Sequence, residues 1–493
     1  MKLVTNIYQN IIIFYMDNSL NYEKLGLRIG LECHQQLDGH KLFCKCPCII
    51  KDENYDFEVK RFLRLSESEL GSLDPAAQFE LRKNKYFIYK GYNNLNCLVE
   101  LDESPPEELN KKALDIALQI TLLLNAKPVD VVQFMRKMVI DGSNVSGFQR
   151  TAVIGFNGYI DTSEGKVNIL SVCLEEESAK KLEDADSFRV YNISRLCIPL
   201  IEIATGPDIH SPSQAKECAE KIGMVLRSVK GVKRGLGTIR QDVNISIKGH
   251  PRIEVKGFQD LRSISKVVDY EISRQLELIK KNFKLISEVR KAEPDFTTSF
   301  LRPMPGSSRM YPETDIKSIY ITKELLSKIK IPELIADKVE NLEELYYLQP
   351  EIAREIIKKE INFEHFVNEY RNVDPKFIAR VIIEIPKDIK SRFNLDITKL
   401  SEDNFHAVLE LVDNNKISKD AVIDVLSDLI KTGVINLNNY KILSKENIEE
   451  DIKKIISNNP GASFGALMGI VMSKLKGKAD GKLVSELIKK HLK

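Results

Sequence analysis

The sequence predicts an α+β fold, with a large and mainly antiparallel sheet in an N-terminal domain, followed by an all-α helical domain and a small all-α tail. Residues 20–322 hold many short apolar runs divided by Gly, Asn, Asp and Pro, which is typical of strands joined by turns. Beyond about residue 322 these runs fade, and charged amphipathic helical patterns replace them. We therefore divide the chain into an N-terminal extension (1–19) and three domains (20–322, 323–435 and 436–493).

The first domain is expected to combine short strands with three longer helices. The predicted strands are Lys24–Leu31, Val129–Ile140, Thr151–Phe156, Val167–Leu174, Thr238–Ile247 and Arg252–Val255. Apolar residues recur three or four positions apart between them, which predicts helices at Asn110–Leu124, Pro212–Ser228 and Ser263–Lys281. No internal repeat period connects these elements, so we expect one mixed domain.

Composition restricts the class of protein. Of the 493 residues, 43% are apolar, which is enough for several cores, and a net charge of +2 gives no global attraction to nucleic acid. Eight cysteines without a regular spacing, no secretory signal and no long apolar run predict a cytoplasmic protein with reduced thiols. Residues 1–15 precede Met16 as either an extension or a misplaced start, and we exclude them from the fold.

Three apolar runs carry carboxylates where a buried strand normally carries hydrocarbon. These runs are Gly30–His34, Val172–Glu176 and Pro199–Ala204. An ionised glutamate in such a run loses hydration that only a cation or several donors can replace, so three runs suggest one shared cation. Together with His34, Glu32, Glu175, Glu176 and Glu202 form an oxygen-rich set that suits Mg²⁺ or Mn²⁺. The alternative is that each glutamate faces water at a strand end or joins a structural ion pair.

Two further segments could bind phosphate. The Gly231–Ile247 segment combines glycines with Lys233, Arg234 and Arg240, although no Walker loop or dinucleotide fingerprint is present, and a basic hairpin is the alternative. Lys256 lies in another apolar run, where a desolvated lysine suggests a role.

The C-terminal segment is strongly basic. Residues 461–493 hold seven lysines against two acidic residues. Such a concentration would neutralise phosphates and bind nucleic acid in a salt-dependent manner, whereas the alternative is a solvated helical face.

Longer motifs then carry a family resemblance. They are Gly30–Leu37 with Lys41–Cys44, Asp141–Thr151, Leu174–Ala179, Pro199–Asp208, Arg234–Ile247 and Arg302–Asp315. Together they resemble the E-type subunit of the archaeal glutamyl-tRNA(Gln) amidotransferase, and the related bacterial B-type subunit shares the first, third and fourth motifs in looser form. The resemblance runs from about residue 22 to the end.

The resemblance implies a tRNA-dependent amidotransferase, a carbon–nitrogen ligase. Such a subunit binds glutamyl-tRNA(Gln), phosphorylates the glutamyl side chain with ATP and Mg²⁺, and lets ammonia displace the phosphate. It also implies a cradle-shaped kinase and transamidase domain over 20–322, a helical domain and a tRNA-binding tail. Successive side chains of a strand point to opposite faces of the sheet, so Glu175 and Glu176 should have unequal roles.

The site residues carried over by motif fall into four groups. The metal set is Glu32, His34, Glu175, Glu176 and Glu202. The nucleotide and phosphate contacts are Lys233, Arg234, Arg240 and Lys256, and catalysis is expected from Glu32, His34, Glu176, Glu202, Arg240 and Lys256. The ammonia or aminoacyl end is lined by Asn144, Ser146, Gln149 and Arg150, with a structural salt bridge as the alternative for Arg150. The tRNA contacts are Lys474, Lys476, Lys478 and Lys482.

What the sequence lacks also defines an expected partner. It contains neither a Ser-cisSer-Lys amidase segment nor a Cys-His-Glu glutaminase arrangement, so the chain should depend on the family's asparaginase-like D-type subunit for ammonia, in a heterotetramer. The inserted domain usual before Arg302 is absent, which leaves tRNA discrimination open. Cys44, Cys46 and Cys48 resemble half of a bacterial zinc knuckle with only Cys97 as a distant partner, so we expect free thiols rather than zinc.

Two other classes of function fit parts of the sequence. The chain could be a non-catalytic tRNA-binding scaffold within such a complex. It could instead be an ATP-dependent ligase that acts on a free carboxylic acid.

Overall fold

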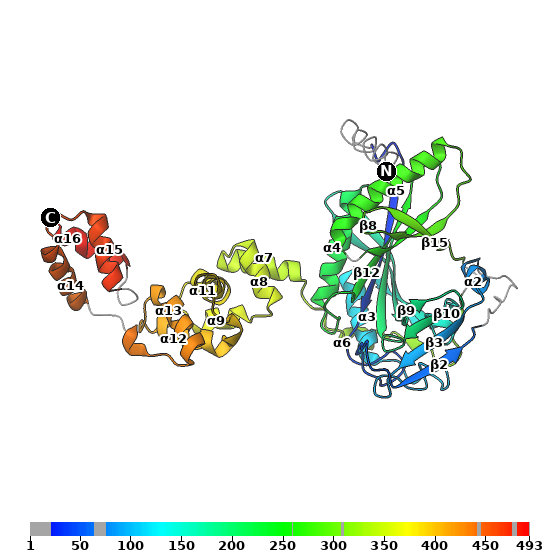
Figure 1. The fold of residues 1–493 in the computed structure, drawn as a ribbon, viewed down its shortest axis with the longest axis horizontal. Helices are drawn as coiled ribbons and strands as arrows, with labels where there is room; N and C mark the ends of the chain where they lie inside the picture. Colours follow the sequence, from blue (N-terminus) through cyan, green and yellow to red (C-terminus); the bar gives the residue numbers. More distant parts are fainter. Residues whose placement is uncertain are drawn as a thin grey trace. The chain divides into compact units, whose positions relative to one another are not determined.

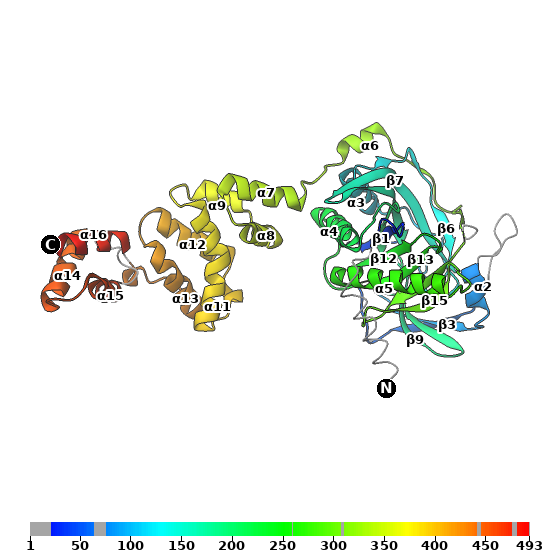
Figure 2. The same ribbon diagram turned by 90° about the horizontal axis from the view of Figure 1, so that it is seen from above.

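The computed structural model describes residues 21–63, 75–258, 260–306, 310–440, 445–475 and 481–492. The predicted N-terminal extension therefore lies outside the described residues. The chain divides into two compact units, one ending at Leu334 and the other beginning at Ile335 (Figures 1 and 2). Each unit is described by itself.

The described strands all lie in the first unit. Their bounds are β1 Arg28–Gln36, β2 Phe57–Arg61, β3 Tyr86–Gly91, β4 Lys127–Pro128, β5 Val131–Val132, β6 Met135–Met138, β7 Phe148–Thr162, β8 Gly165–Glu176, β9 Lys180–Asp184, β10 Phe188–Asn192, β11 Pro199–Thr205, β12 Ile239–Ser246, β13 Ile253–Phe258, β14 Glu288–Ala292, β15 Thr298–Pro303, β16 Met310–Pro312 and β17 Ile319–Tyr320.

An eleven-stranded sheet organises this unit. Its order is β15-β14-β13-β12-β1-β11-β8-β7-β6-β16, with β4 paired to β7. The β13–β14 pair is parallel and the other pairs of this sheet are antiparallel, which confirms the predicted α+β class with a mainly antiparallel sheet. A smaller sheet of order β2-β3-β10-β9 and the β5–β17 pair complete the unit.

Three helices cover one face of the large sheet (Figure 1). They are α3 (Lys111–Leu123), α4 (Pro212–Ser228) and α5 (Leu261–Lys280), close to their predicted ranges. Each begins at a side-chain cap: Asn110, Ser211 and Asp260 accept hydrogen bonds from backbone N–H groups of the first turn. Apolar residues of the three helices pack with those of the central strands in one core.

The central strand β1 has two chemically different faces. Ile29, Leu31 and Cys33 are fully or almost fully buried in the core beneath the helices. Because successive side chains of a strand point to opposite faces, Glu32 and His34 lie on the other side of the sheet. The alternation thus places an acidic residue and an imidazole on the face that the helices leave open.

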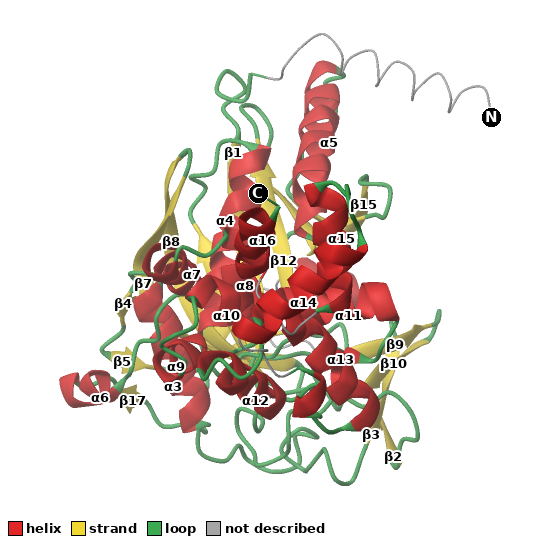
Figure 3. Cartoon of the chain, turned by 90° about the vertical axis from the view of Figure 1, so that its left-hand side faces the viewer, coloured by secondary structure: helices red, strands yellow, loops and turns green. Residues whose placement is uncertain are grey.

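The second unit is helical (Figure 3). Its α-helices are α7 Ile335–Tyr346, α8 Pro350–Lys358, α9 Phe363–Glu369, α10 Pro375–Ala379, α11 Ile385–Phe393, α12 Glu402–Asp413, α13 Val422–Thr432, α14 Lys445–Asn458, α15 Phe464–Lys474 and α16 Gly481–His491. The first unit also contains the short helices α2 (Pro75–Leu81) and α6 (Lys323–Lys328). Leu325, Leu326 and Ile329 pack against the core of the first unit, so that unit extends beyond residue 322.

Two separate cores lie in the second unit. One gathers buried residues from Val339 to Ile430, and the other gathers residues from Ile448 to Ile488. In the part of the chain that the structure describes, every helix is too short or too polar to cross a bilayer.

Candidate active site

A cavity of about 510 Å³ opens on the face of the large sheet opposite the helices. Of the described residues, eight acidic and five basic ones line it, together with His34. The acidic residues are Glu32, Glu80, Asp141, Glu175, Glu177, Glu202, Asp242 and Glu254. The basic residues are Lys137, Arg240, Arg252, Lys256 and Arg302. Acidic side chains therefore outnumber basic ones in this half-open cavity.

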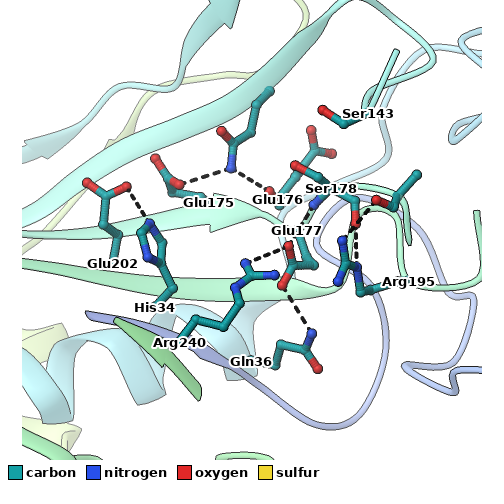
Figure 4. A network of polar contacts seen from close by, with 12 residues as sticks. His34, Gln36, Ser143, Glu175, Glu176, Glu177, Ser178, Arg195, Glu202 and Arg240 are labelled. Carbon is teal, nitrogen blue, oxygen red and sulfur yellow. Dashed lines mark hydrogen bonds and ion pairs between the residues drawn. The ribbon is translucent and has the colours of Figure 1, made fainter. Parts of the chain in front are cut away.

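Strand register brings the first acidic group together. His34 on β1 is opposite Glu202 on β11 and Arg240 on β12, and directly opposed residues share a face of the sheet. The imidazole Nε2 of His34 lies 3.2 Å from Oε2 of Glu202 (Figure 4). These side chains, distant in sequence, are neighbours because two strands flank β1.

Glu175 joins this group from β8. Its Oε1 accepts a hydrogen bond from Lys137 Nζ at 2.7 Å, and the same ammonium lies 3.8 Å from Glu202. Gln149 donates to the other carboxylate oxygen of Glu175 at 2.9 Å and to the backbone carbonyl of Glu176 at 2.7 Å. The amide of Gln149 thereby fixes the orientation of the Glu175 carboxylate.

A second acidic group surrounds Lys256 on β13. Its ammonium donates to Asp242 Oδ2 at 2.6 Å and pairs with Glu254. Glu32, opposite Asp242 on the neighbouring strand, accepts from Asn244 at 3.0 Å. Lys256 is thus held by several carboxylates rather than projecting alone into the cavity.

The pKa values show how unevenly the charge is balanced. Burial, and then Glu254, raises the pKa of Glu32, while burial and Glu202 raise the pKa of Glu175. Although burial opposes it, the hydrogen bond to Glu202 raises the pKa of His34. Burial also opposes the ionisation of Glu202, but Lys137 and then His34 bring its pKa well below the usual value. Two carboxylates therefore lack full compensation by the chain's own cations.

Glu177 forms a third, well-compensated acidic position (Figure 4). Its carboxylate accepts hydrogen bonds from Arg240 at 2.8 Å and from Gln36 at 3.1 Å. Burial would raise the pKa of Glu177, but Arg240 and Arg195 lower it below the usual value. This anion holds the Arg240 guanidinium at the edge of the cavity.

The donor set fits a hard divalent cation. His34, Glu175 and Glu202 offer ligand atoms within 4.8 Å of one another, and so do Glu32, His34 and Asp242. Carboxylate oxygens with one imidazole suit Mg²⁺ or Mn²⁺ better than a metal that prefers thiolates. The raised pKa values of Glu32 and Glu175 mark carboxylates that a cation would stabilise in the ionised form.

Glu176 and Arg150 lie outside the cavity lining. Glu176 faces the other side of β8, where its carboxylate lies 3.4 Å from Nη1 of Arg150. Arg150 also pairs with Glu313 at 2.7 Å, and all three side chains are at least 95% buried. Strand alternation separates Glu176 from Glu175, so Glu176 and Arg150 form a buried pair, which is the alternative that the sequence left open for Arg150.

Of the other residues predicted at the ammonia or aminoacyl end, Gln149 lines the cavity, and Asn144 and Ser146 do not. The Asn144 side-chain oxygen accepts hydrogen bonds from the hydroxyls of Ser143 and Ser178. The Ser146 hydroxyl donates to the backbone carbonyl of Phe148.

Lys233, Arg234 and Arg240 are all among the described residues, and of these three Arg240, on β12, lines the cavity. The Lys233 ammonium bonds the carbonyl of Cys48, and Arg234 is exposed ahead of Gly235 and Gly237, both at positive φ. Lys233 and Arg234 therefore lie outside the cavity lining, because the glycine turn precedes the strand that leads into the cavity, and their contact with a nucleotide stays a prediction.

Sequence reasoning missed Lys137, Glu177, Asp242 and Glu254. The signal was present for Glu177 and Asp242, because each lies two residues from a predicted site residue on the same strand face or its extension. Glu254 carried the same signal, because it lies two residues before Lys256 on β13. Lys137 carried none, since its role depends on which strands become neighbours.

The tail and the cysteines can be placed in part. Lys474 pairs with Asp451 at 3.2 Å and Lys482 is exposed on α16, whereas Lys476 and Lys478 lie outside the described residues.

Three thiols, Cys44, Cys46 and Cys97, lie close to Glu100, while Cys48 is not in that group. The Glu100 carboxylate already pairs with the fully buried Lys41, so a zinc ion there would have to share it.

Comparison with known families gives the class. Residues 27–327 match the model of the GatB/GatE catalytic domain, and residues 362–492 match that of the GatB domain. Since the first match alone covers more than half of the chain, this chain belongs to the GatB/GatE family.

Similar proteins give a narrower relation. A protein of Methanocaldococcus jannaschii, named as the E-type subunit of glutamyl-tRNA(Gln) amidotransferase, is 38% identical over 583 positions, covering 89% of this chain and 92% of its own length. Proteins of the same name from Methanococcus maripaludis and Archaeoglobus fulgidus are each 35% identical, with the same shares covered. The first alignment is longer than the 493 residues of this chain, so that relative contains segments absent here. The family resemblance seen in the sequence is confirmed.

Proposed function

We propose that this chain is the subunit of a tRNA-dependent amidotransferase that phosphorylates the glutamyl side chain of glutamyl-tRNA(Gln) with ATP and Mg²⁺ and then amidates it. The observation that carries the proposal is the convergence of Glu32, His34, Glu175 and Glu202 in one cavity with Arg240 and Lys256 at its wall. Family membership and the names of the relatives support the same reaction.

The chemistry explains why phosphorylation precedes amidation. Ammonia cannot displace oxide from a carboxylate, so a carboxylate oxygen first attacks the γ-phosphorus of ATP, and ADP leaves as the bond between phosphorus and the bridging oxygen breaks. The ammonia nitrogen then attacks the acyl carbon, phosphate leaves with the electrons of the C–O bond, and one proton is lost as the amide forms. Both steps depend on positioning and on charge stabilisation more than on covalent catalysis by the protein.

The chain's own residues have distinct parts in this scheme. Arg240 and Lys256 would bind phosphate oxygens, and Glu177 would keep the Arg240 guanidinium in place. Mg²⁺ held by Glu32, His34, Glu202 and Glu175 would neutralise charge on the phosphates. Lys137 and Gln149 would keep the Glu175 carboxylate in position for that role.

Two partners complete the proposal. The exposed lysines of the C-terminal helices, Lys482 among them, would contact the tRNA backbone. An asparaginase-like D-type subunit would supply ammonia, in keeping with the absence of an amidase or glutaminase motif from the sequence.

The direct test is an assay that bypasses the partner. The full chain is incubated with glutamyl-tRNA labelled in its glutamate, ATP, Mg²⁺ and an ammonium salt, and the amino acid is released and separated as glutamate or glutamine. We expect glutamine to form, and to fall at least 100-fold for Glu202→Gln. Glu183→Gln on the exposed strand β9 is the matched control, because it removes the same charge outside the cavity lining.

The same assay separates the rival functions. A non-catalytic scaffold would give no glutamine in any sample. In assays with the partner present, a scaffold would leave the Glu202→Gln variant fully active. A ligase of free carboxylic acids would hydrolyse ATP when a small acid replaces the aminoacyl-tRNA, and such stimulation would contradict the proposal.

A further inference from the structure

The second unit brings two imidazoles and a carboxylate together at the surface between two helices. His365 and Glu369 lie one turn apart on α9, and His406 lies on α12. One ligand atom of each lies within 4.8 Å of the other two. The cluster belongs to a different unit from the acidic cavity, and neither the proposed reaction nor the family matches assign it a role.

The distances within the cluster converge on a single oxygen. Oε2 of Glu369 lies 3.4 Å from Nε2 of His365 and 3.1 Å from Nδ1 of His406. In a tetrahedral zinc site, bonds of about 2.0–2.1 Å place neighbouring ligand atoms about 3.3 Å apart. The two measured edges agree with that spacing, so small side-chain movements suffice to admit an ion.

Neighbouring side chains fix two of the three groups. The ring of His406 stacks on Phe366, with centroids 4.2 Å apart and an angle of 17°. The Tyr370 hydroxyl lies 3.1 Å from Oε1 of Glu369, the carboxylate oxygen that does not face the imidazoles, and 2.8 Å from Nδ1 of His406. Zinc at Nδ1 of His406 would replace the contact between that nitrogen and the Tyr370 hydroxyl. The hydroxyl can then donate to Oε1 while Oε2 is used as a ligand, which is the usual second contact of a ligating carboxylate.

The helices themselves are tied together beside the cluster. The backbone N–H of Asn372, just after α9, donates to Asp413 at the end of α12 at 2.8 Å, and the Asn372 side chain makes a second contact at 3.3 Å. This link sets the position of α9 along α12. The cluster is thus partly preorganised by contacts that do not depend on a metal.

We propose that His365, Glu369 and His406 bind a zinc ion that links α9 to α12, with water at the fourth position. Two imidazoles and one carboxylate are a typical zinc donor set, whereas Mg²⁺ prefers sites in which oxygen ligands predominate. The side chains are 58%, 43% and 24% exposed, respectively, so an ion can enter from solvent without unfolding of the unit. The site is independent of the amidotransferase reaction proposed above.

The test measures zinc stoichiometry of the full chain, because the thiols at Cys44, Cys46 and Cys97 and the acidic cavity can also take up zinc. Metal-free protein is titrated with Zn²⁺ in competition with a chromogenic chelator. We expect the wild type to bind one zinc ion more than His365→Ala, and Glu369→Gln to bind that ion at least tenfold more weakly. Glu364→Gln is the matched control, since it removes one carboxylate from the same helix outside the cluster.

His365→Ala is the decisive variant because the side chain is exposed and its loss does not threaten folding. Thermal unfolding gives a second readout: Zn²⁺ should raise the melting temperature of the second unit in the wild type and in Glu364→Gln, and the shift should be absent in His365→Ala. Equal zinc stoichiometry in the wild type and His365→Ala, or an equal zinc-dependent shift in both, would overturn the proposal.

Discussion

Glu175 and Glu176 are adjacent in sequence but should respond in opposite ways to the same substitution. Glu175 faces the cavity, where burial and Glu202 raise its pKa, and Glu176 faces the buried guanidinium of Arg150. We compare Glu175→Gln with Glu176→Gln, which remove the same charge with little change of shape. The first should abolish activity and keep stability, and the second should lower stability and keep activity.

The loss of stability in Glu176→Gln follows from the buried ion pair with Arg150. Removing one partner of a buried ion pair costs about 3–5 kcal/mol, and we expect about 3 kcal/mol because Arg150 keeps Glu313 at 2.7 Å. The roughly 300 described residues of the first unit give an unfolding entropy of ~0.63 kcal/mol/K. The melting temperature should therefore fall by about 5 °C.

The effect of Glu175→Gln should be the reverse. The substitution removes a carboxylate from a cavity with excess negative charge, and Lys137 keeps Glu202 as a partner at 3.8 Å. We expect a melting temperature within about 2 °C of the wild type, because the desolvation penalty of an anion is relieved as one ion pair is lost. The kcat of ammonia-dependent amidation should fall at least ~100-fold, the usual effect of removing a preorganised electrostatic contact.

Calorimetry of the full chain and kcat at 25 °C measure the two effects on the same samples. A Glu176→Gln variant that is inactive yet as stable as the wild type would refute the reasoning, since it would return Glu176 to the metal set. An unstable but active Glu175→Gln variant would refute it equally.

Three further perturbations test other parts of the site. Burial opposes the ionisation of Glu313, but the hydrogen bond from Arg136 brings its pKa to about 2, so its stabilising effect is present above about pH 4.5 and is lost as the pH falls toward 2. Acid unfolding of Glu313→Gln should accordingly depend less on pH than that of the wild type, by up to about 1.4 kcal/mol per pH unit in this window, and parallel curves would contradict this. Lys256→Met should raise the KM for ATP at least tenfold, because it removes a proposed phosphate contact and leaves Asp242 uncompensated; an unchanged KM would exclude Lys256 from nucleotide binding. Lys482→Gln should reduce the slope of log affinity for tRNA against log salt by about 0.7–0.9, and an identical slope would show that this lysine contacts no phosphate.

The sequence allowed the central acidic set to be predicted because the relevant pattern is local. Glu32 and His34 interrupt an apolar run at alternate positions, which is visible without knowledge of the neighbouring strands. The same rule separated Glu175 from Glu176 but could not say which of them faces the cavity. That choice depends on the pairing of β8 with β11, which places Glu175 opposite Leu200.

Elements with polar sequences were harder to predict. The strand β9, Lys180–Asp184, is largely exposed and has four charged residues among five, so no apolar alternation marks it. Lys137 was missed for a related reason, because it lies in a short strand whose value to the site comes from the contact with Glu175. Such residues are identified only when the register between strands is known.

The apolar core and the acidic cavity depend on one register. A shift of β1 by one residue would turn Glu32 and His34 toward the helices and bring Leu31 and Cys33 to the cavity. Such a shift would bury a carboxylate and an imidazole in hydrocarbon without partners, at a cost of several kcal/mol for each charge. The packing of Leu31 and Cys33 beneath the helices therefore holds the register that keeps Glu32 and His34 beside their cavity partners. The core on one face of the sheet therefore determines which side chains face the cavity on the other.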